Sequence, residues 1–257
     1  MTPTQAVQVS ISGRIATVTL ASPPANALGL ALKSGLADAL DAADAANARV
    51  LVVRSDVDGY FAAGADLKLL VGLDAGGFLE YIAGLRSVLE RIADAPMISV
   101  AVIDGFALGG GLELAMACTI RVASPRAKIG VPEIKLGLLP GAGGTQRLPR
   151  LVGRGPALDL LLSGRSISAE EGFRLGLVDH LASDGAIDGL AIELAGRYAA
   201  GPSAALAATV RCVDAARDLP FAEGMIVERD EIIELFGTED AHEGISAFVE
   251  KRRAAFH

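Results

Sequence analysis

Short apolar runs alternate with longer segments of helical spacing in the first half of the chain, and this alternation constrains the fold more than any other feature. Residues 50–54 and 98–103 are almost wholly apolar, which is typical of strands buried on both faces. Residues 30–46 and 78–93 carry apolar side chains at helical spacing, and Pro96 ends the second segment. The alternation predicts an α/β fold in which helices pack on parallel strands.

The two ends of the chain follow other patterns. Strand-like residues 7–12 and 15–20 flank a Ser-Gly-Arg turn, which predicts a β-hairpin. From about residue 201 the pattern is helical, and we expect helices at 203–216, 221–236 and 239–253. We therefore predict a core of residues 1–200 that holds the active site, and a C-terminal helical region of residues 201–257.

Composition excludes several classes of protein. The 257 residues are 51% hydrophobic and carry a net charge of −8, which argues against a nucleic-acid-binding surface. The two cysteines and three histidines show no spacing typical of disulfides or metal sites. Charges interrupt every apolar stretch before it reaches membrane-spanning length, and the N-terminus lacks the pattern of a secretory signal. We expect a soluble cytoplasmic protein with no metal, no membrane partner and no nucleic-acid partner.

A glycine-rich turn follows the predicted strand at 98–103. Gly109, Gly110 and Gly111 precede a predicted helix at 112–118, and Glu113 lies two residues after them. Unpaired N–H groups in the first turn of a helix, together with the helix dipole, form a binding place for an oxyanion. A plain strand-to-helix turn is the alternative, since glycine runs alone are weak signals, and the dinucleotide-binding fingerprint is not matched.

Residues 61–68 (FAAGADLK) form a second candidate segment after a strand-like run. Small residues around Gly64 would leave the N–H of Ala65 accessible, and Lys68 could contact a phosphate. The alternative is a surface turn with a solvated lysine.

A third segment covers residues 131–148, where Glu133 follows a proline in apolar surroundings. A buried carboxyl has a raised pKa and can hold a proton near neutral pH. The alternative is an exposed glutamate paired with Lys135. With Glu113, this segment supplies two carboxyls and backbone donors without a metal motif, which suggests acid/base chemistry on a carbonyl compound.

Together, and in this order, these segments resemble the crotonase superfamily, and most closely its enoyl-CoA hydratases. The similar segments cover nearly the whole chain: 26–28, 63–68, 107–113, 132–148 and 244–252. The resemblance implies a spiral of stacked strand–strand–helix turns. It also implies that the C-terminal helices mediate assembly into a homotrimer or a hexamer, which would be a dimer of trimers.

The resemblance also implies roles for individual residues. Glu113 and Glu133 correspond to the catalytic pair of glutamates, and the N–H groups of Ala65 and Gly110 would form the oxyanion hole. The N–H of Gly141 would hold the reacting water. The residues implied to bind CoA, the last two of them on a neighbouring subunit, are Ala63, Ala65, Asp66, Leu67, Lys68, Phe248 and Lys251.

The implied activity is hydration of trans-2-enoyl-CoA to 3-hydroxyacyl-CoA, as in fatty acid β-oxidation, with no cofactor because CoA is part of the substrate. Family members with other activities often lose one of the two acids, so the presence of both favours hydration. Pro23 departs from the pattern, because hydratases often carry a basic residue there near the CoA phosphates. The alternatives are an enoyl-CoA isomerase that uses one glutamate, a non-catalytic acyl-CoA-binding subunit, or a specialised hydratase of amino-acid or polyketide metabolism.

Overall fold

The computed structural model of the protein describes residues 5–256. The chain begins with an antiparallel hairpin of β1 (Val7–Ser12) and β2 (Ile15–Leu20), joined at Gly13, whose φ of 56° suits a tight turn. This confirms the hairpin predicted from the sequence. β2 then pairs in parallel with β3, so the hairpin forms one edge of a larger sheet.

Two sheets receive strands in turn as the chain advances. The larger sheet has the order β1-β2-β3-β5-β7-β10 and the smaller one the order β4-β6-β8-β9. All pairs are parallel except β1 with β2 and β8 with β9. The remaining strands are β3 (Val50–Ser55), β4 (Tyr60–Ala62), β5 (Ile98–Ile103), β6 (Phe106–Leu108), β7 (Ile120–Ala123), β8 (Lys128–Gly130), β9 (Ser166–Ser168) and β10 (His180–Leu181).

Three successive pairs of strands (β3 and β4, β5 and β6, β7 and β8) thus each give one strand to the larger sheet and the next to the smaller sheet. A helix or loop then leads to the following pair. This is the strand–strand–helix spiral that the resemblance implied. The sequence had suggested a single strand before the glycine turn, whereas the structure places a second one there, β6.

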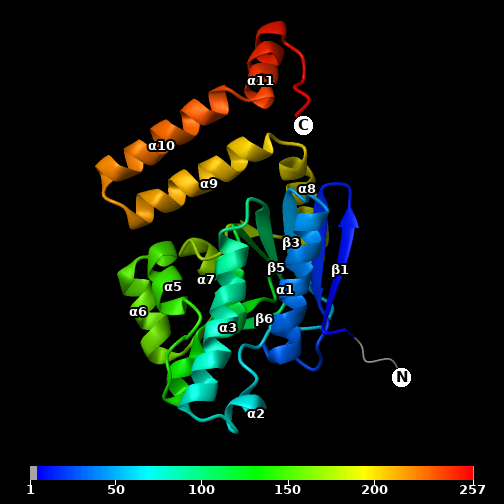
Figure 1. Ribbon diagram of the computed structural model, residues 1–257. Coiled ribbons are helices and arrows are strands. Elements are labelled where there is room, and N and C mark those ends of the chain that lie inside the picture. The colour runs from blue at the N-terminus through cyan, green and yellow to red at the C-terminus, as the bar shows by residue number, and fades with distance from the viewer. Residues whose placement is uncertain (1–4, 257) are drawn as a thin grey trace.

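Helices cover both faces of the larger sheet. Figure 1 shows α1 and α3 side by side on one face, and these two helices contact each other. On the other face α8 packs against β3, β5 and β7, where Val100, Val122 and Leu194 are buried. The helices of this body are α1 (Leu30–Ala45), α2 (Leu67–Leu70), α3 (Ala75–Ala93), α4 (Gly110–Ala117), the 3-10 helix η1 (Pro132–Leu136), α5 (Gly144–Val152), α6 (Arg154–Ser163), α7 (Ala169–Arg174) and α8 (Ile187–Ala199).

Helix α3 begins three residues earlier than the sequence pattern predicted. The Asp74 side chain accepts a hydrogen bond from the N–H of Gly77 at 2.8 Å and so caps the first turn. The apolar spacing starts only with Phe78, which explains why periodicity alone placed the start too late.

Three helices form the C-terminal region: α9 (Ser203–Asp218), α10 (Phe221–Phe236) and α11 (Glu239–Glu250). Figure 1 shows α9 and α10 lying side by side, with α11 at the end of the molecule opposite α2. The last helix is shorter than predicted, because Lys251 has a φ of 55° and Arg252 folds back onto Glu243. The predicted domain boundary falls in the turn between α8 and α9, and a trimerising role for the C-terminal region stays a prediction.

No helix within residues 5–256 is long and apolar enough to cross a membrane.

Candidate active site

The glycine turn between β6 and α4 is held in a conformation that suits only glycine. Gly109 has φ 53° and ψ −125°, and its N–H donates to the carbonyl of Gly130 on the neighbouring strand β8 at 2.9 Å. A Cβ on Gly111 would collide with the carbonyl of Ala62 at the end of β4. The turn is therefore pressed between two strands of the smaller sheet, and the N-terminus of α4 is buried there.

Two backbone N–H groups without a protein acceptor lie at this turn. Gly64 has φ 91°, and a Cβ on it would come within 2.8 Å of the Leu108 carbonyl and 3.3 Å of the Gly110 nitrogen. This close approach sets Ala65 beside Gly110. Within residues 5–256, neither Ala65 nor Gly110 donates its N–H to an acceptor. Paired N–H groups of this kind can bind an oxygen that gains negative charge.

The Glu113 carboxylate is buried and held by backbone donors. Its side chain is on α4, only 2% of the residue is exposed, and Oε1 accepts hydrogen bonds from the N–H groups of Ala142 and Gly144 at 2.7 Å each. Gly144 begins α5, so this carboxylate lies at the positive end of that helix. Burial raises the pKa of Glu113, and the hydrogen bonds from Gly144 and Ala142 oppose that rise by favouring the ionised form.

Glu133 lies on η1 in a different environment. Its Oε2 is buried and has no hydrogen-bond partner in the described part of the chain, while Oε1 lies so close to Gly109 that a Cβ there would collide with it. Burial raises the pKa of Glu133 to about 7, and the charge of Glu113 adds to this effect. Lys135 is exposed, and no ion pair between it and Glu133 is found among residues 5–256. Glu133 is therefore a carboxyl with a buried oxygen and not an exposed glutamate paired with Lys135.

The structure brings both carboxyls to the same glycine turn. Glu133 contacts Gly109, and a Cβ on Gly110 would lie 3.8 Å from Glu113 Oε2. Gly141 lies one residue before Ala142, in the loop that binds Glu113, and its N–H has no acceptor within residues 5–256. One carboxyl that accepts two backbone hydrogen bonds, one that holds a proton near pH 7, and nearby N–H donors together allow acid/base chemistry on a bound carbonyl compound.

The residues predicted to bind CoA fall into two groups that lie far apart in one chain. The first group, residues 63–68, leads into α2 and contains Ala65, whose N–H lies at the glycine turn. Asp66 caps α2, because its carboxylate accepts hydrogen bonds from the N–H groups of Lys68 and Leu69, and the Lys68 side chain is exposed. Phe248 is 86% exposed on α11 and Lys251 follows this helix, at the opposite end of the molecule from α2 (Figure 1).

No sequence pattern indicated the groups that hold Glu113. Nothing in residues 141–144 shows that the N–H groups of Ala142 and Gly144 point at a carboxylate. Arg86 carried no indication either, although its Nε donates to the carbonyl of Gly141 at 2.6 Å across a separation of 55 residues. No local pattern marks such a contact.

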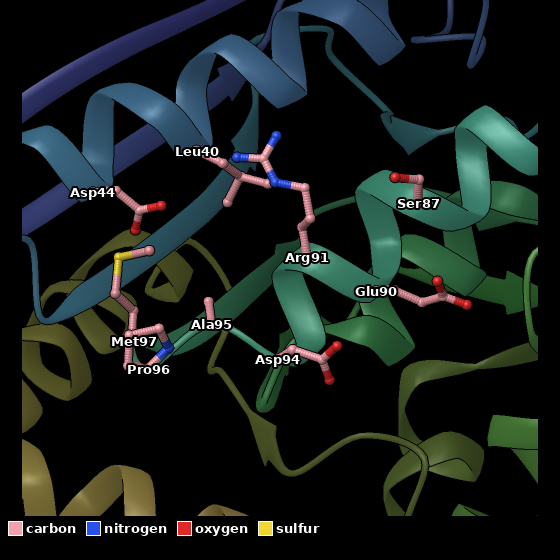
Figure 2. A pocket seen from close by; sticks show the side chains of 9 residues that line it. All are labelled: Leu40, Asp44, Ser87, Glu90, Arg91, Asp94, Ala95, Pro96 and Met97. Carbon is pink, nitrogen blue, oxygen red and sulfur yellow. The ribbon is translucent and has the colours of Figure 1, made fainter.

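A cavity of about 390 Å³ lies away from these residues, at the C-terminal ends of α1 and α3. Figure 2 shows its charged lining, in which Arg91 of α3 extends toward α1. It contains none of the predicted site residues. Its lining consists of Leu40, Asp44, Ser87, Glu90, Arg91, Asp94, Ala95, Pro96 and Met97.

Comparison with known proteins identifies the family. Residues 10–257 match the protein family described as enoyl-CoA hydratase/isomerase. The chain belongs to this family. A probable enoyl-CoA hydratase from Rhizobium meliloti (strain 1021) is 42% identical over 96% of each chain. The mitochondrial methylglutaconyl-CoA hydratase of Mus musculus is 37% identical over 88% of this chain and 74% of its own.

Solved structures confirm the fold of the family. The crystal structure of an enoyl-CoA hydratase from Bacillus anthracis superposes with a TM-score of 0.93 at 34% identity, and the match covers 98% of this chain and 99% of that one. The fold is therefore the crotonase fold of the enoyl-CoA hydratase/isomerase family, and membership implies an acyl-CoA substrate.

Proposed function

We propose that this protein is an enoyl-CoA hydratase, a hydro-lyase that adds water across the double bond of trans-2-enoyl-CoA to give 3-hydroxyacyl-CoA. The observation that supports the proposal most is the pair of carboxyls at the glycine turn, of which Glu113 is buried and Glu133 is partly buried. Glu113 accepts two backbone hydrogen bonds that favour its ionised form, whereas Glu133 has an unpartnered oxygen and a pKa raised to about 7. A hydration needs one group of each kind.

The thioester oxygen would bind to the N–H groups of Ala65 and Gly110. When water adds at C3, electrons of the double bond shift toward the thioester, and the oxygen becomes enolate-like. Donors already fixed in place stabilise this charge, and the loss of one such donor typically costs about 2.7–4 kcal/mol. The tight contact of Gly64 with the glycine turn supports this role, because it fixes the spacing of the two segments.

The two carboxyls would divide the proton transfers. Ionised Glu113 takes a proton from the water whose oxygen bonds to C3, and the N–H of Gly141 helps to hold that water. Protonated Glu133 gives its proton to C2. A proton then passes from Glu113 back to Glu133, which restores the starting state. Because the two groups influence each other, their pKa values belong to the pair.

The segment before α2 would bind the CoA part of the substrate through Ala63, Ala65, Asp66, Leu67 and Lys68. We propose that Phe248 and Lys251 contact CoA bound to a neighbouring subunit of a homotrimer or hexamer, since they lie at the far end of their own chain (Figure 1). Sedimentation analysis would test the assembly. A cytoplasmic location, a role in β-oxidation and independence of any cofactor complete the proposal.

The test is a parallel assay of hydration and isomerisation. Wild-type protein is given crotonyl-CoA and, separately, a 3-enoyl-CoA of the same length, and products are separated by chromatography. We expect rapid formation of 3-hydroxybutyryl-CoA. Glu113→Gln and Glu133→Gln should each lower kcat for hydration by about 100-fold or more, the range of general acid–base catalysis, while CoA binding persists.

Faster isomerisation than hydration would assign the protein to the isomerases of its family. CoA binding without either reaction would indicate a non-catalytic subunit. If either glutamine variant hydrates crotonyl-CoA at the wild-type rate, the assignment of that carboxyl is wrong.

A further inference from the structure

The loop of residues 141–144, which binds the Glu113 carboxylate, accepts a hydrogen bond from an arginine of another helix. The carbonyl of Gly141 and the N–H of Ala142 belong to one peptide group. Arg86 Nε donates to the carbonyl at 2.6 Å, and the N–H donates to Glu113 Oε1 at 2.7 Å. Because a peptide group is planar and stiff, fixing its carbonyl also fixes the direction of its N–H.

A second arginine contacts the next peptide group. Arg147 Nη1 donates to the carbonyl of Ala142 at 3.0 Å, and its guanidinium occupies the place where a Cβ on Gly143 would lie. Gly143 has φ 107°, so this turn of the loop is made for glycine. Arg147 belongs to α5, the same segment as the loop, whereas Arg86 reaches the loop from α3.

Arg86 thus gives the loop a side-chain hydrogen bond from a separate, packed element. Its neighbour Leu85 is 2% exposed in the main core, and α3 contacts α4, the helix that carries Glu113. Outside the loop lies a cavity of about 420 Å³, and its lining includes Arg86, Ala142, Gly143, Arg147 and Arg150. Ile82 of α3 packs on Gly141, and on the side of the cavity the Arg86 guanidinium adds a hydrogen bond to the Gly141 carbonyl.

We propose that Arg86 is a positioning residue for the acid/base pair: through the Gly141–Ala142 peptide group it directs the N–H of Ala142 at the Glu113 carboxylate. This inference rests on the proposed hydratase function. Hydrogen bonds in such a chain polarise one another, so the cation also favours the ionised carboxylate.

Four ionisable groups face Glu113 from the elements around it. Arg86 and Tyr81 come from α3, Arg147 from α5 and Glu133 from η1. Both arginines favour the ionised form of Glu113. Loss of Arg86 therefore raises the pKa of Glu113, and the base becomes ionised only at higher pH. Glu133 does not bond to this peptide group, so the loss of Arg86 should reach its titration only through the charge of Glu113.

Arg86→Met removes both the charge and the donor, and Arg86→Lys restores a charged donor. Arg150→Met is the matched control, because Arg150 lines the same cavity but bonds to Asp218 and to the carbonyl of Gln146. For Arg86→Met we expect kcat lower by about tenfold, in keeping with one lost hydrogen bond to a charged group, and KM within about twofold of wild type. The acid limb of the kcat profile should move up by roughly half a pH unit or more.

Arg86→Lys should recover most of kcat and return the acid limb toward wild type, and Arg150→Met should match wild type in both. A fall in kcat with no movement of the acid limb, or no rescue by lysine, would overturn the proposal, because it would show a merely structural role.

A measurement without turnover keeps this proposal separate from the proposed function. The carboxyl carbon of ¹³C-labelled Glu113, assigned by its absence in Glu113→Gln, can be titrated by NMR in wild type and Arg86→Met. We expect it to titrate at higher pH in Arg86→Met, even if the protein does not hydrate crotonyl-CoA. An unchanged titration overturns the role of Arg86 and leaves the hydratase assignment standing.

Discussion

Replacement of Glu133 by glutamine should stabilise the protein at alkaline pH while it destroys turnover. In the unfolded chain this carboxyl ionises near its ordinary value of 4.5, whereas in the folded protein burial raises its pKa to about 7. Between these values the folded state holds a proton that the unfolded state has lost. The contribution of Glu133 to stability is therefore complete below pH 4.5, declines as the pH rises toward 7, and stays low above that.

The size of the effect follows from the same two values. Each unit of difference between the two pKa values corresponds to about 1.4 kcal/mol of unfolding free energy. Because Glu133 is partly exposed, screening by solvent reduces the total loss of unfolding free energy to about 2 kcal/mol. Glutamine has nearly the same shape and no charge, so it avoids this loss. Relative to wild type, Glu133→Gln should gain about 2 kcal/mol of unfolding free energy between pH 4.5 and pH 8.

Urea unfolding at several pH values measures this difference directly. Comparison with a pH well below 4.5, where the carboxyl is neutral in both states, removes any cost of the amide group itself. Glu80→Gln, at an exposed position on α3, is the control for the exchange of a carboxyl for an amide at the surface. If the stability of Glu133→Gln relative to wild type is independent of pH, Glu133 is not the buried, proton-holding carboxyl described above.

Other consequences can be measured separately. The kcat/KM of wild type for crotonyl-CoA should fall above the pKa of Glu133, at about 7, because the acid then loses its proton. A kcat/KM that stays constant from about pH 6 to about pH 9 would contradict the assignment. Gly109→Ala should lower both kcat and the melting temperature, because Gly109 has φ 53° and a Cβ would collide with Glu133 Oε1; an alanine variant with wild-type kinetics would refute this. Lys68→Ala should raise KM by about fivefold with kcat unchanged, as expected for one exposed ion pair with a phosphate, and an unchanged KM would show that Lys68 is merely solvated. Asn26→Ala should cost about 3 kcal/mol in urea unfolding, because the buried side chain makes three hydrogen bonds, and a loss below about 1 kcal/mol would contradict that account.

The sequence predicted those elements whose signals are local. The hairpin was readable because Gly13 separates two strand-like runs, and β5 was readable because all its residues except Ser99 are apolar. β6 was not, since three residues are too few to show a period of two. Its pairing with β4 and β8 makes it a strand, and that pairing joins parts of the chain that are distant in sequence.

The candidate site shows the same division. Glu113 and Glu133 were singled out by their neighbours in sequence, and the family resemblance supplied their roles. Composition could not decide whether Glu133 is exposed or buried, because burial depends on how η1 packs against the glycine turn. Arg86 carried no signal at all, since its contact with the Gly141 carbonyl exists only once α3 is packed in place.

The register of the smaller sheet has a consequence for how this protein can change over time. Glu113 follows β6 and Glu133 follows β8, and these strands are adjacent, with Leu108 opposite Gly130. The separation of the two acids is therefore set by a backbone ladder rather than by the length of chain that joins them. We expect a change of length in the connection around residue 125 to move the two carboxyls less than a slip of one residue between β6 and β8, which would separate them. The sequence and length of the connecting loops can therefore change during evolution while the separation of Glu113 and Glu133 is kept by the pairing of β6 with β8.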